Sequence, residues 1–222
     1  PQSLTDRTLV IEGTDPDATV IDMTSGSSKA QSVTFKNVTV KRNSGAYGGL
    51  QHTGEEHFEN SKVYGTIVTY APVFSAVNTE FYQTDPSNYN VHIYAEGRVS
   101  FDGCKFFCAG KSIYAHHEAA TPHYISISNC TFNASRISSG KAAIQLHTEL
   151  GIYGTLDVTN CTATGFDSTI NGGLWNELNN TTKVLTDKFV KTIDGKVVVR
   201  TDAGLASALA AVQAGETTIS LT

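Results

Sequence analysis

Several features that would place a protein in a familiar class are scarce in this chain of 222 residues. No stretch approaches the roughly 20 consecutive apolar residues of a membrane-spanning helix, so we expect no span. The 16 Lys and Arg residues are outnumbered by 21 Asp and Glu residues, which argues against a nucleic-acid partner. The chain has 4 cysteines and no CxxC pair, so it predicts neither a disulfide scaffold nor a zinc site.

What the chain does contain is a high density of strand-forming residues. Hydrophobic residues make up 40% of the sequence, which is too many for a disordered chain. Short runs rich in Val, Ile, Thr, Phe and Tyr alternate with Gly, Asn, Asp and Ser, the pattern of strands separated by turns. One segment, Asp202–Ala214, has apolar residues at helical spacing and is followed by Gly215, so it predicts a short amphipathic helix.

A six-residue motif recurs along most of the chain. It consists of an apolar residue, any residue, Asn, a small residue, any residue and an apolar residue. Its central positions are Asn37, Asn60, Asn78, Gly103, Asn129 and Asn160, separated by 23, 18, 25, 26 and 31 residues. A repeat of this length is typical of one coil of a solenoid.

With these six coils, the chain resembles the right-handed parallel β-helix proteins of the pectate-lyase-like superfamily over roughly residues 5–168. The resemblance implies an all-β, single-stranded right-handed parallel β-helix of about six to seven coils, and it identifies no particular member. It also implies that the turn asparagines stack and hydrogen-bond through their amides, with Gly103 interrupting the ladder. Resemblance of architecture carries no activity with it.

The small residue after each motif Asn is expected to face the core. This places Cys104, Cys130 and Cys161 in one internal stack, where we interpret them as small buried hydrophobic residues. Adjacent coils lie about 4.8 Å apart, so one disulfide is possible in this stack, but free thiols are favoured. We expect no metal and no cofactor.

A second column of aligned segments predicts where a functional face lies. The segments beginning at Ile67, Val91, Ile113 and Ile144 align without gaps. Stacking them places in one row the ring side chains of Tyr70, Tyr94, His116 and His147. A parallel row two residues further on contains Glu96, Glu118 and Glu149.

Two interpretations of these rows stay open. Neighbouring carboxylates about 5 Å apart, or Glu96 and Glu149 about 10 Å apart, match the spacing of acid and base in glycosidases. In that reading, Glu118, Glu149 and Glu96, with His116 and His147, are the candidate catalytic residues. The simpler reading is that glutamates at strand ends are solvated turn residues.

The enzymes of the resembled superfamily favour the simpler reading. Its lyases use calcium-binding Asp clusters with a basic residue as proton acceptor, and its hydrolases use Asp clusters on neighbouring strands. Neither pattern is present, and Arg98 and Arg136 lie beside no matching Asp set. No phosphate-binding loop or nucleophile elbow is present either.

The order of segments at the two ends is unusual for a parallel β-helix. We divide the chain into coils over 1–170, an irregular lid or hairpin over 171–198, and a capping helix plus strand over 199–222. The last segment resembles the opening of a β-helix, and residues 4–13 resemble the strand that normally follows it. The chain is therefore expected to be a unit of a tandem array, a subunit whose 199–222 segment caps a neighbour, or a chain that caps itself.

These observations favour a non-catalytic β-helix module at the cell surface, outside the cell or on a virion, with a structural or adhesive role. The predicted ligand-binding face consists of Tyr70, Tyr94, Tyr114, His116, Glu118, His147 and Glu149, and the expected ligands are glycans. Self-association or contact with tandem neighbours is expected through residues 199–222. The competing hypothesis is a polysaccharide-degrading enzyme that uses the stacked Glu and His residues.

Overall fold

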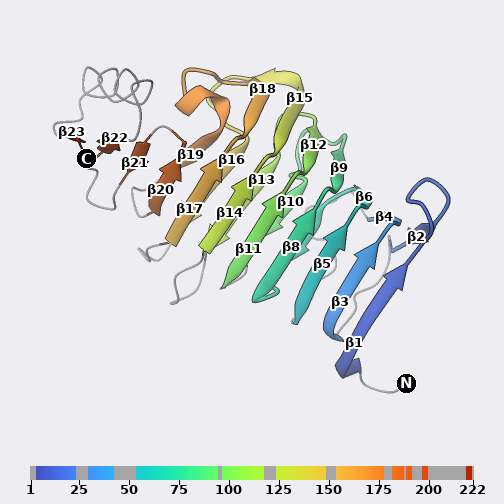
Figure 1. Ribbon diagram of the computed structural model, residues 1–222. Coiled ribbons are helices and arrows are strands. Elements are labelled where there is room, and N and C mark those ends of the chain that lie inside the picture. The colour runs from blue at the N-terminus through green and yellow to red at the C-terminus, as the bar shows by residue number, and fades with distance from the viewer. Residues whose placement is uncertain are drawn as a thin grey trace.

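The chain folds into stacked coils whose strands form three sheets around one core (Figure 1). The computed structural model describes residues 4–23, 30–42, 54–94, 97–117, 124–148, 154–177, 182–187, 189–191, 197–199 and 219–221. Consecutive strands in each sheet come from successive coils and are parallel, except where β21 enters sheet A. This is an all-β parallel β-helix, and that part of the sequence prediction is confirmed.

Sheet A is the longest of the three. In spatial order it contains β1 (Leu4–Glu12), β3 (Ala30–Lys36), β5 (Glu55–Glu59), β8 (Val73–Val77), β11 (Arg98–Asp102), β14 (Tyr124–Ser128), β17 (Gly154–Thr159), β20 (Thr182–Thr186), β21 (Phe189–Lys191), β22 (Val197–Val199) and β23 (Ile219–Leu221).

Sheets B and C supply the other two sides of the coils. Sheet B contains β2 (Val20–Asp22), β4 (Thr39–Lys41), β6 (Lys62–Tyr64), β9 (Glu80–Gln83), β12 (Lys105–Cys108), β15 (Thr131–Ser138) and β18 (Thr162–Phe166). Sheet C contains β7 (Ile67–Thr69), β10 (Val91–Ile93), β13 (Ile113–His117), β16 (Ile144–Thr148) and β19 (Trp175–Glu177). The seven strands of sheet B mark seven coils in the described residues, which agrees with the expected number.

The repeated Asn forms the corner between sheets A and B. Asn37, Asn60, Asn78, Asn129 and Asn160 all have φ between 47° and 55°. This left-handed conformation turns the chain sharply, and Asn tolerates it better than most residues. The amides stack as expected, with the Asn160 Nδ2 donating to Asn129 Oδ1 at 2.7 Å.

Gly103 interrupts the Asn ladder for a physical reason. Its φ is +63°, and a Cβ at this position would lie 2.5 Å from the Asn78 Oδ1. The ladder continues past it through Asp102, whose carboxylate accepts a hydrogen bond from the Asn129 Nδ2 at 2.7 Å. The next coil is therefore still connected to this corner.

The small residue after each Asn hydrogen-bonds the corner backbone. The Ser61 Oγ accepts from the Val38 N–H at 3.3 Å and donates to the Glu59 carbonyl at 2.8 Å. The Cys161 Sγ accepts from the Cys130 N–H at 3.4 Å in the same way. Buried corner N–H groups would otherwise lack a partner, which is costly, so Ser, Thr and Cys suit this position.

The three stacked cysteines are free thiols, as expected, and Cys104 and Cys130 are fully buried. The hydrogen bond with Cys104 is the main cause that raises the pKa of Cys130 to about 12. At neutral pH this thiol is therefore protonated and a poor nucleophile.

The core is a ladder of phenylalanines that continues from coil to coil. Phe81, Phe106 and Phe132 stack with ring centroids 4.9 and 4.7 Å apart and ring planes within 12° of parallel. Phe101 packs edge-on against Phe81 and Phe106. Strand alternation places each of these rings inside, so the apolar positions of the motif determine the register of the coils.

The coil stack continues beyond residue 170, where the sequence pattern ended. The 3₁₀ turn η1 (Asn171–Gly173) leads into β19, which pairs with β16, and β20 pairs with β17. Part of the segment 171–198 therefore extends sheets C and A, and β21 and β22 then form an antiparallel pair. The three-part division of the chain stays a prediction, and the predicted capping helix lies outside the described residues.

No helix in the described part of the chain is long and apolar enough to cross a membrane.

Candidate functional site

The predicted row of rings lies along sheet C. The register pairs Val91 with Ile67, and Ile113 with both Val91 and Ile144, which is the alignment that the sequence predicted. Tyr70 and Tyr94 stack with ring centroids 4.9 Å apart, and Tyr94 lies 5.0 Å from His116. His116 and His147 stack at 5.4 Å with an interplanar angle of 7°. We call these four side chains the ring row: Tyr70, Tyr94, His116 and His147.

A second line of side chains supports the ring row. His92 and Tyr114 occupy the same rung position on neighbouring strands, with ring centroids 4.8 Å apart, and Gln145 continues the line. A hydrogen bond of 2.7 Å joins the Tyr114 hydroxyl to the His147 Nδ1. The Tyr89 hydroxyl donates to the Gln145 Oε1 at 2.8 Å. These contacts hold the rings of three coils in one arrangement.

The sequence prediction included Tyr114 but missed Tyr89, His92 and Gln145. The signal for His92 and Gln145 was present, because residues two apart in a strand share a face with the ring row. Tyr89 lies in the connection between β9 and β10, where no periodicity predicts the direction of a side chain.

Burial keeps part of this face uncharged near neutral pH. Desolvation, together with the nearby His116, lowers the pKa of His92 to about 4. Desolvation also raises the pKa of Tyr89 to about 12. These two groups therefore contribute neutral rings, which suits contact with neutral ligands better than binding of an ion.

The predicted carboxylate row cannot be placed beside the ring row. Glu96, Glu118 and Glu149 all lie outside the described residues. The register of β13 and β16 runs as far as His117 and Thr148, the residues immediately before Glu118 and Glu149. The proximity of these carboxylates stays a prediction.

Metal binding is not indicated in the part of the chain that the structure describes. There, no group of three or more His, Cys, Asp or Glu residues is arranged to hold a metal ion. The near-parallel stacking of His116 and His147 presents ring faces to each other, whereas a shared ion requires nitrogens that converge.

A second exposed set of rings lies on sheet B and was missed by the sequence analysis. Tyr64 and Tyr82 stack at 4.7 Å, and Tyr82 and Phe107 stack at 4.9 Å. The Tyr82 hydroxyl donates to the Glu80 Oε2 at 2.6 Å, and Glu80 pairs with Lys105 at 3.0 Å. This ladder follows from the same register, but the sequence motif marks only its inward neighbours.

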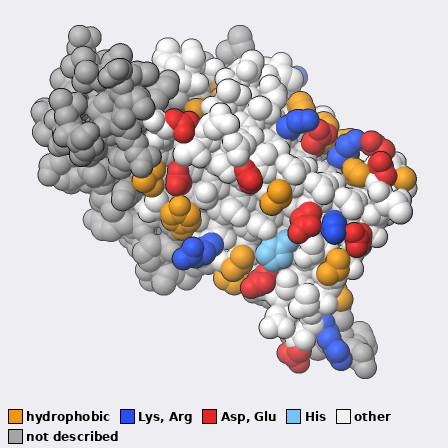
Figure 2. Space-filling view, in the orientation of Figure 1, with side chains coloured by type: hydrophobic (Ala, Val, Ile, Leu, Met, Phe, Trp, Pro, Cys, Tyr) orange, Lys and Arg blue, Asp and Glu red, His pale blue; other side chains and the backbone are white. Residues whose placement is uncertain are grey.

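The outer face of sheet A is mostly uncharged and polar, with single charged side chains scattered over it (Figure 2). On this face, a hydrogen bond of 2.7 Å joins the His57 Nδ1 to the Ser75 Oγ, and the His57 Nε2 lies 3.6 Å from Glu55. This arrangement resembles a Ser-His-acid relay. Strand β8 pairs on both sides, with β5 and β11, so the N–H groups of these strands are used in the sheet and offer no oxyanion hole.

A shallow hollow beside the Asn corner is also part of the scaffold. The Asn78 Nδ2 donates to Asn60 Oδ1 at 3.4 Å, and Lys62 pairs with Asp17. The side chains around it are therefore already engaged with one another; the lining consists of Pro16, Asn37, Asn60, Ser61, Lys62, Asn78 and Glu80.

No protein-family model, curated protein or solved structure matches this chain. The function is therefore inferred from the fold and from the geometry of the ring row.

Proposed function

We propose that this chain is a non-catalytic β-helix module with a structural and adhesive role, which binds glycans along sheet C. The observation that supports this proposal is the ring row, which continues without a break across four coils. At a rung spacing of about 4.8 Å, the row extends about 14 Å along the solenoid. That length accommodates several sugar rings of an extended chain.

The chemistry of the row suits carbohydrate. Sugars present hydroxyl groups and apolar C–H faces, and tyrosine combines a hydrogen-bonding tip with an apolar ring. The two ring nitrogens of His116 are buried, so His116 offers only the carbon atoms of its ring. Tyr70 is 40% exposed, so part of it is accessible at the start of the row. The bonds from Tyr114 to His147 and from Tyr89 to Gln145 fix the face before a ligand arrives, which lowers the entropic cost of binding.

Two broader assignments belong to the same proposal. The coil architecture and the Asn corner support membership of the pectate-lyase-like superfamily. A module that holds glycans on a rigid solenoid would act outside the cell, at a cell surface or on a virion, where such ligands are displayed.

The test compares two tyrosines that the fold places in matched surroundings. Tyr70 is 40% exposed and stacks on Tyr94 at 4.9 Å, whereas Tyr64 is 42% exposed and stacks on Tyr82 at 4.7 Å on another sheet. Binding to an array of polysaccharides is measured for the parent protein, for Tyr70→Ala and for Tyr64→Ala. The proposal expects loss of binding in Tyr70→Ala alone. Equal binding by both variants, or no binding by the parent chain, contradicts it.

A polysaccharide-degrading enzyme is the second candidate. The register that brings His116 beside His147 also aligns the positions that precede Glu118 and Glu149. Turnover of any polysaccharide by the parent protein, abolished in Glu118→Gln/Glu149→Gln, would establish this function instead. Binding without turnover leaves the adhesive function as the better account.

A further inference from the structure

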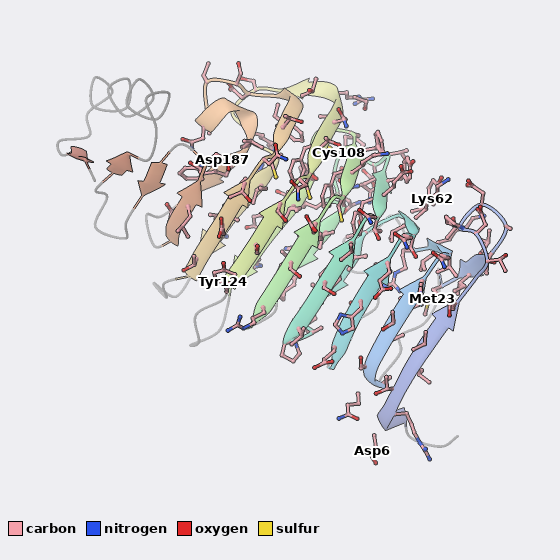
Figure 3. The ribbon with its side chains drawn as sticks, viewed as in Figure 1. Asp6, Met23, Lys62, Cys108, Tyr124 and Asp187 are labelled. Atoms are coloured by element: carbon pink, nitrogen blue, oxygen red, sulfur yellow. The ribbon has the colours of Figure 1, made fainter. Side chains whose placement is uncertain are left out.

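The end of the solenoid formed by β1 and β2 exposes a layer of apolar side chains. Leu9, Ile11, Ile21 and Met23 pack against the core but are only partly buried. Their partners one coil further on are Val33, Phe35 and Val40, which pair with Leu9, Ile11 and Ile21 and are at most 1% exposed. One more coil on top of this layer would bury it to the same extent. Figure 3 shows Met23 at this end of the molecule.

Strand β1 also has an edge that pairs with no other strand in the described part of the chain. Among the described residues it pairs with β3 alone. The Gly13 N–H donates to the Lys36 carbonyl at 2.9 Å, so alternation directs the N–H groups of Leu9 and Ile11 toward β3 as well. The N–H of Val10 therefore points to the open side, and the Val10 side chain is 61% exposed.

The opposite end of sheet A presents a strand of matching direction. Strand β21 is antiparallel to both β20 and β22, and β23 is parallel to β22. Two reversals restore the original direction, so β23 runs the same way as β1 and the other coil strands. These two strands lie at opposite ends of the solenoid (Figure 1).

We propose that the β23 end of one copy of this chain docks on the β1–β2 end of a second copy and extends sheet A as a parallel pair. The occupant is thus strand β23 (Ile219–Leu221) of the second copy. Two features favour it over other partners. Its strand direction is the one that continues the sheet, and it lies at the end of the same sheet that β1 begins.

The alternation of apolar and other residues in β23 also matches that of β1. Strand β23 reads Ile219-Ser220-Leu221, and the edge it would meet contains Leu9 and Ile11 on either side of Val10. Because the two surfaces differ, the contact is heterologous and head-to-tail, so it repeats and builds a linear assembly. This inference goes beyond glycan binding and does not depend on it.

The experiment disables each surface separately in the full-length chain. Val10→Pro removes the N–H on the open side of β1 and leaves the bonds to β3, and edge strands tolerate proline. Ser220→Pro disables the β23 surface. Val10→Thr keeps the N–H and serves as the matched control. Met23→Lys, which places a charge in the half-exposed layer, is a second variant of the β1–β2 surface. Circular dichroism verifies that each variant is folded.

Sedimentation velocity over a wide range of protein concentration measures the size of the species that each variant forms. The parent chain and Val10→Thr are expected to form species larger than a dimer. Val10→Pro, Met23→Lys and Ser220→Pro alone are expected to remain monomers. An equimolar mixture of Val10→Pro and Ser220→Pro retains one intact surface of each kind, so it should form a dimer and nothing larger.

Three outcomes overturn the proposal. One is a parent chain that stays monomeric at every concentration. Another is unchanged association of folded Val10→Pro and Met23→Lys. The third is a mixture that forms no dimer, since this would indicate a contact between like surfaces. Glycan binding is measured on a different sheet and with different variants, so the two proposals fail independently.

Discussion

Two ionisable side chains buried inside the solenoid, Arg42 and Glu56, make a specific prediction about stability and pH. Glu56 is fully buried and Arg42 is 5% exposed. Desolvation is the dominant effect on Glu56, and it raises the pKa from 4.5 to about 7 despite the opposing influences of Arg42 and Thr69. Desolvation likewise lowers the pKa of Arg42 to about 10, so the guanidinium stays charged at neutral pH.

The direction of the pH effect follows from proton linkage. Between pH 4.5 and about 7 the folded chain retains a proton on Glu56 that the unfolded chain has lost. The contribution of Glu56 to stability is therefore fully present below 4.5 and is lost as the pH rises through about 7. At about 1.4 kcal/mol per pH unit, the loss amounts to about 3 kcal/mol.

His92 changes stability in the opposite direction over much of this range. Its pKa falls from 6.5 to about 4 on folding, so its contribution is lost as the pH falls through that window. The parent protein alone would therefore show a weak net dependence. Comparison with Glu56→Gln isolates Glu56, because all other titrating groups are common to both proteins.

The free energy of unfolding is measured by urea denaturation below pH 4.5 and above pH 8, for the parent protein and for Glu56→Gln. The stability of Glu56→Gln relative to the parent should increase by about 3 kcal/mol between the two conditions. Equal m-values verify that the same cooperative unit unfolds in both proteins. Arg42→Met removes the opposing charge, so it should extend the loss of stability to higher pH.

A difference between Glu56→Gln and the parent that does not change with pH would refute the reasoning. So would a change of opposite sign. Either result would mean that the Glu56 carboxylate is not buried as the structure has it.

Three further predictions concern the scaffold, and urea denaturation at neutral pH measures each. Phe106→Ala should lower the free energy of unfolding by about 3–5 kcal/mol, because it leaves a cavity in the stacked core. Phe107→Ala, on the outer face of β12, should lower it by only about 1 kcal/mol. Equal losses would contradict the register of β12. Thr79→Val keeps the shape of the side chain but removes the hydroxyl that accepts a hydrogen bond from the Ser61 N–H. The free energy of unfolding should therefore fall by about 1–3 kcal/mol. An unchanged free energy of unfolding would exclude this hydrogen bond at the corner. Asn129→Ala should lower the free energy of unfolding by about 1–2 kcal/mol, because alanine adopts the positive φ of this position less readily. Asn129→Gly should lower it less. The reverse order would contradict the left-handed corner.

Much of the coil architecture was predictable because it depends on local chemistry. The Asn motif needs a left-handed turn, and its flanking apolar residues alternate with the period of a strand. Both signals recur at each coil, so the alignment of Ile67, Val91, Ile113 and Ile144 and the inward stack of cysteines were predicted correctly.

The pattern failed where coils depart from the motif. β19 and β20 extend the sheets beyond residue 170, although the six-residue Asn motif does not recur in the sequence there. Their placement follows from pairing with β16 and β17, a contact between distant segments. The ladder of Tyr64, Tyr82 and Phe107 was missed for a related reason, since outward positions carry no constraint that repeats in the sequence.

The sequence by itself thus determined the repeating coil, its corner and its inward faces, because each depends on the preferences of a few adjacent residues. The ring row on sheet C was predicted as an alignment, but its support by Tyr89, His92 and Gln145 came from the tertiary structure. The burial of Arg42 and Glu56 within electrostatic reach of each other and the common direction of β1 and β23 were decided there as well. These features join residues that are far apart in the chain or depend on how strands reverse, so only the assembled fold brings them together.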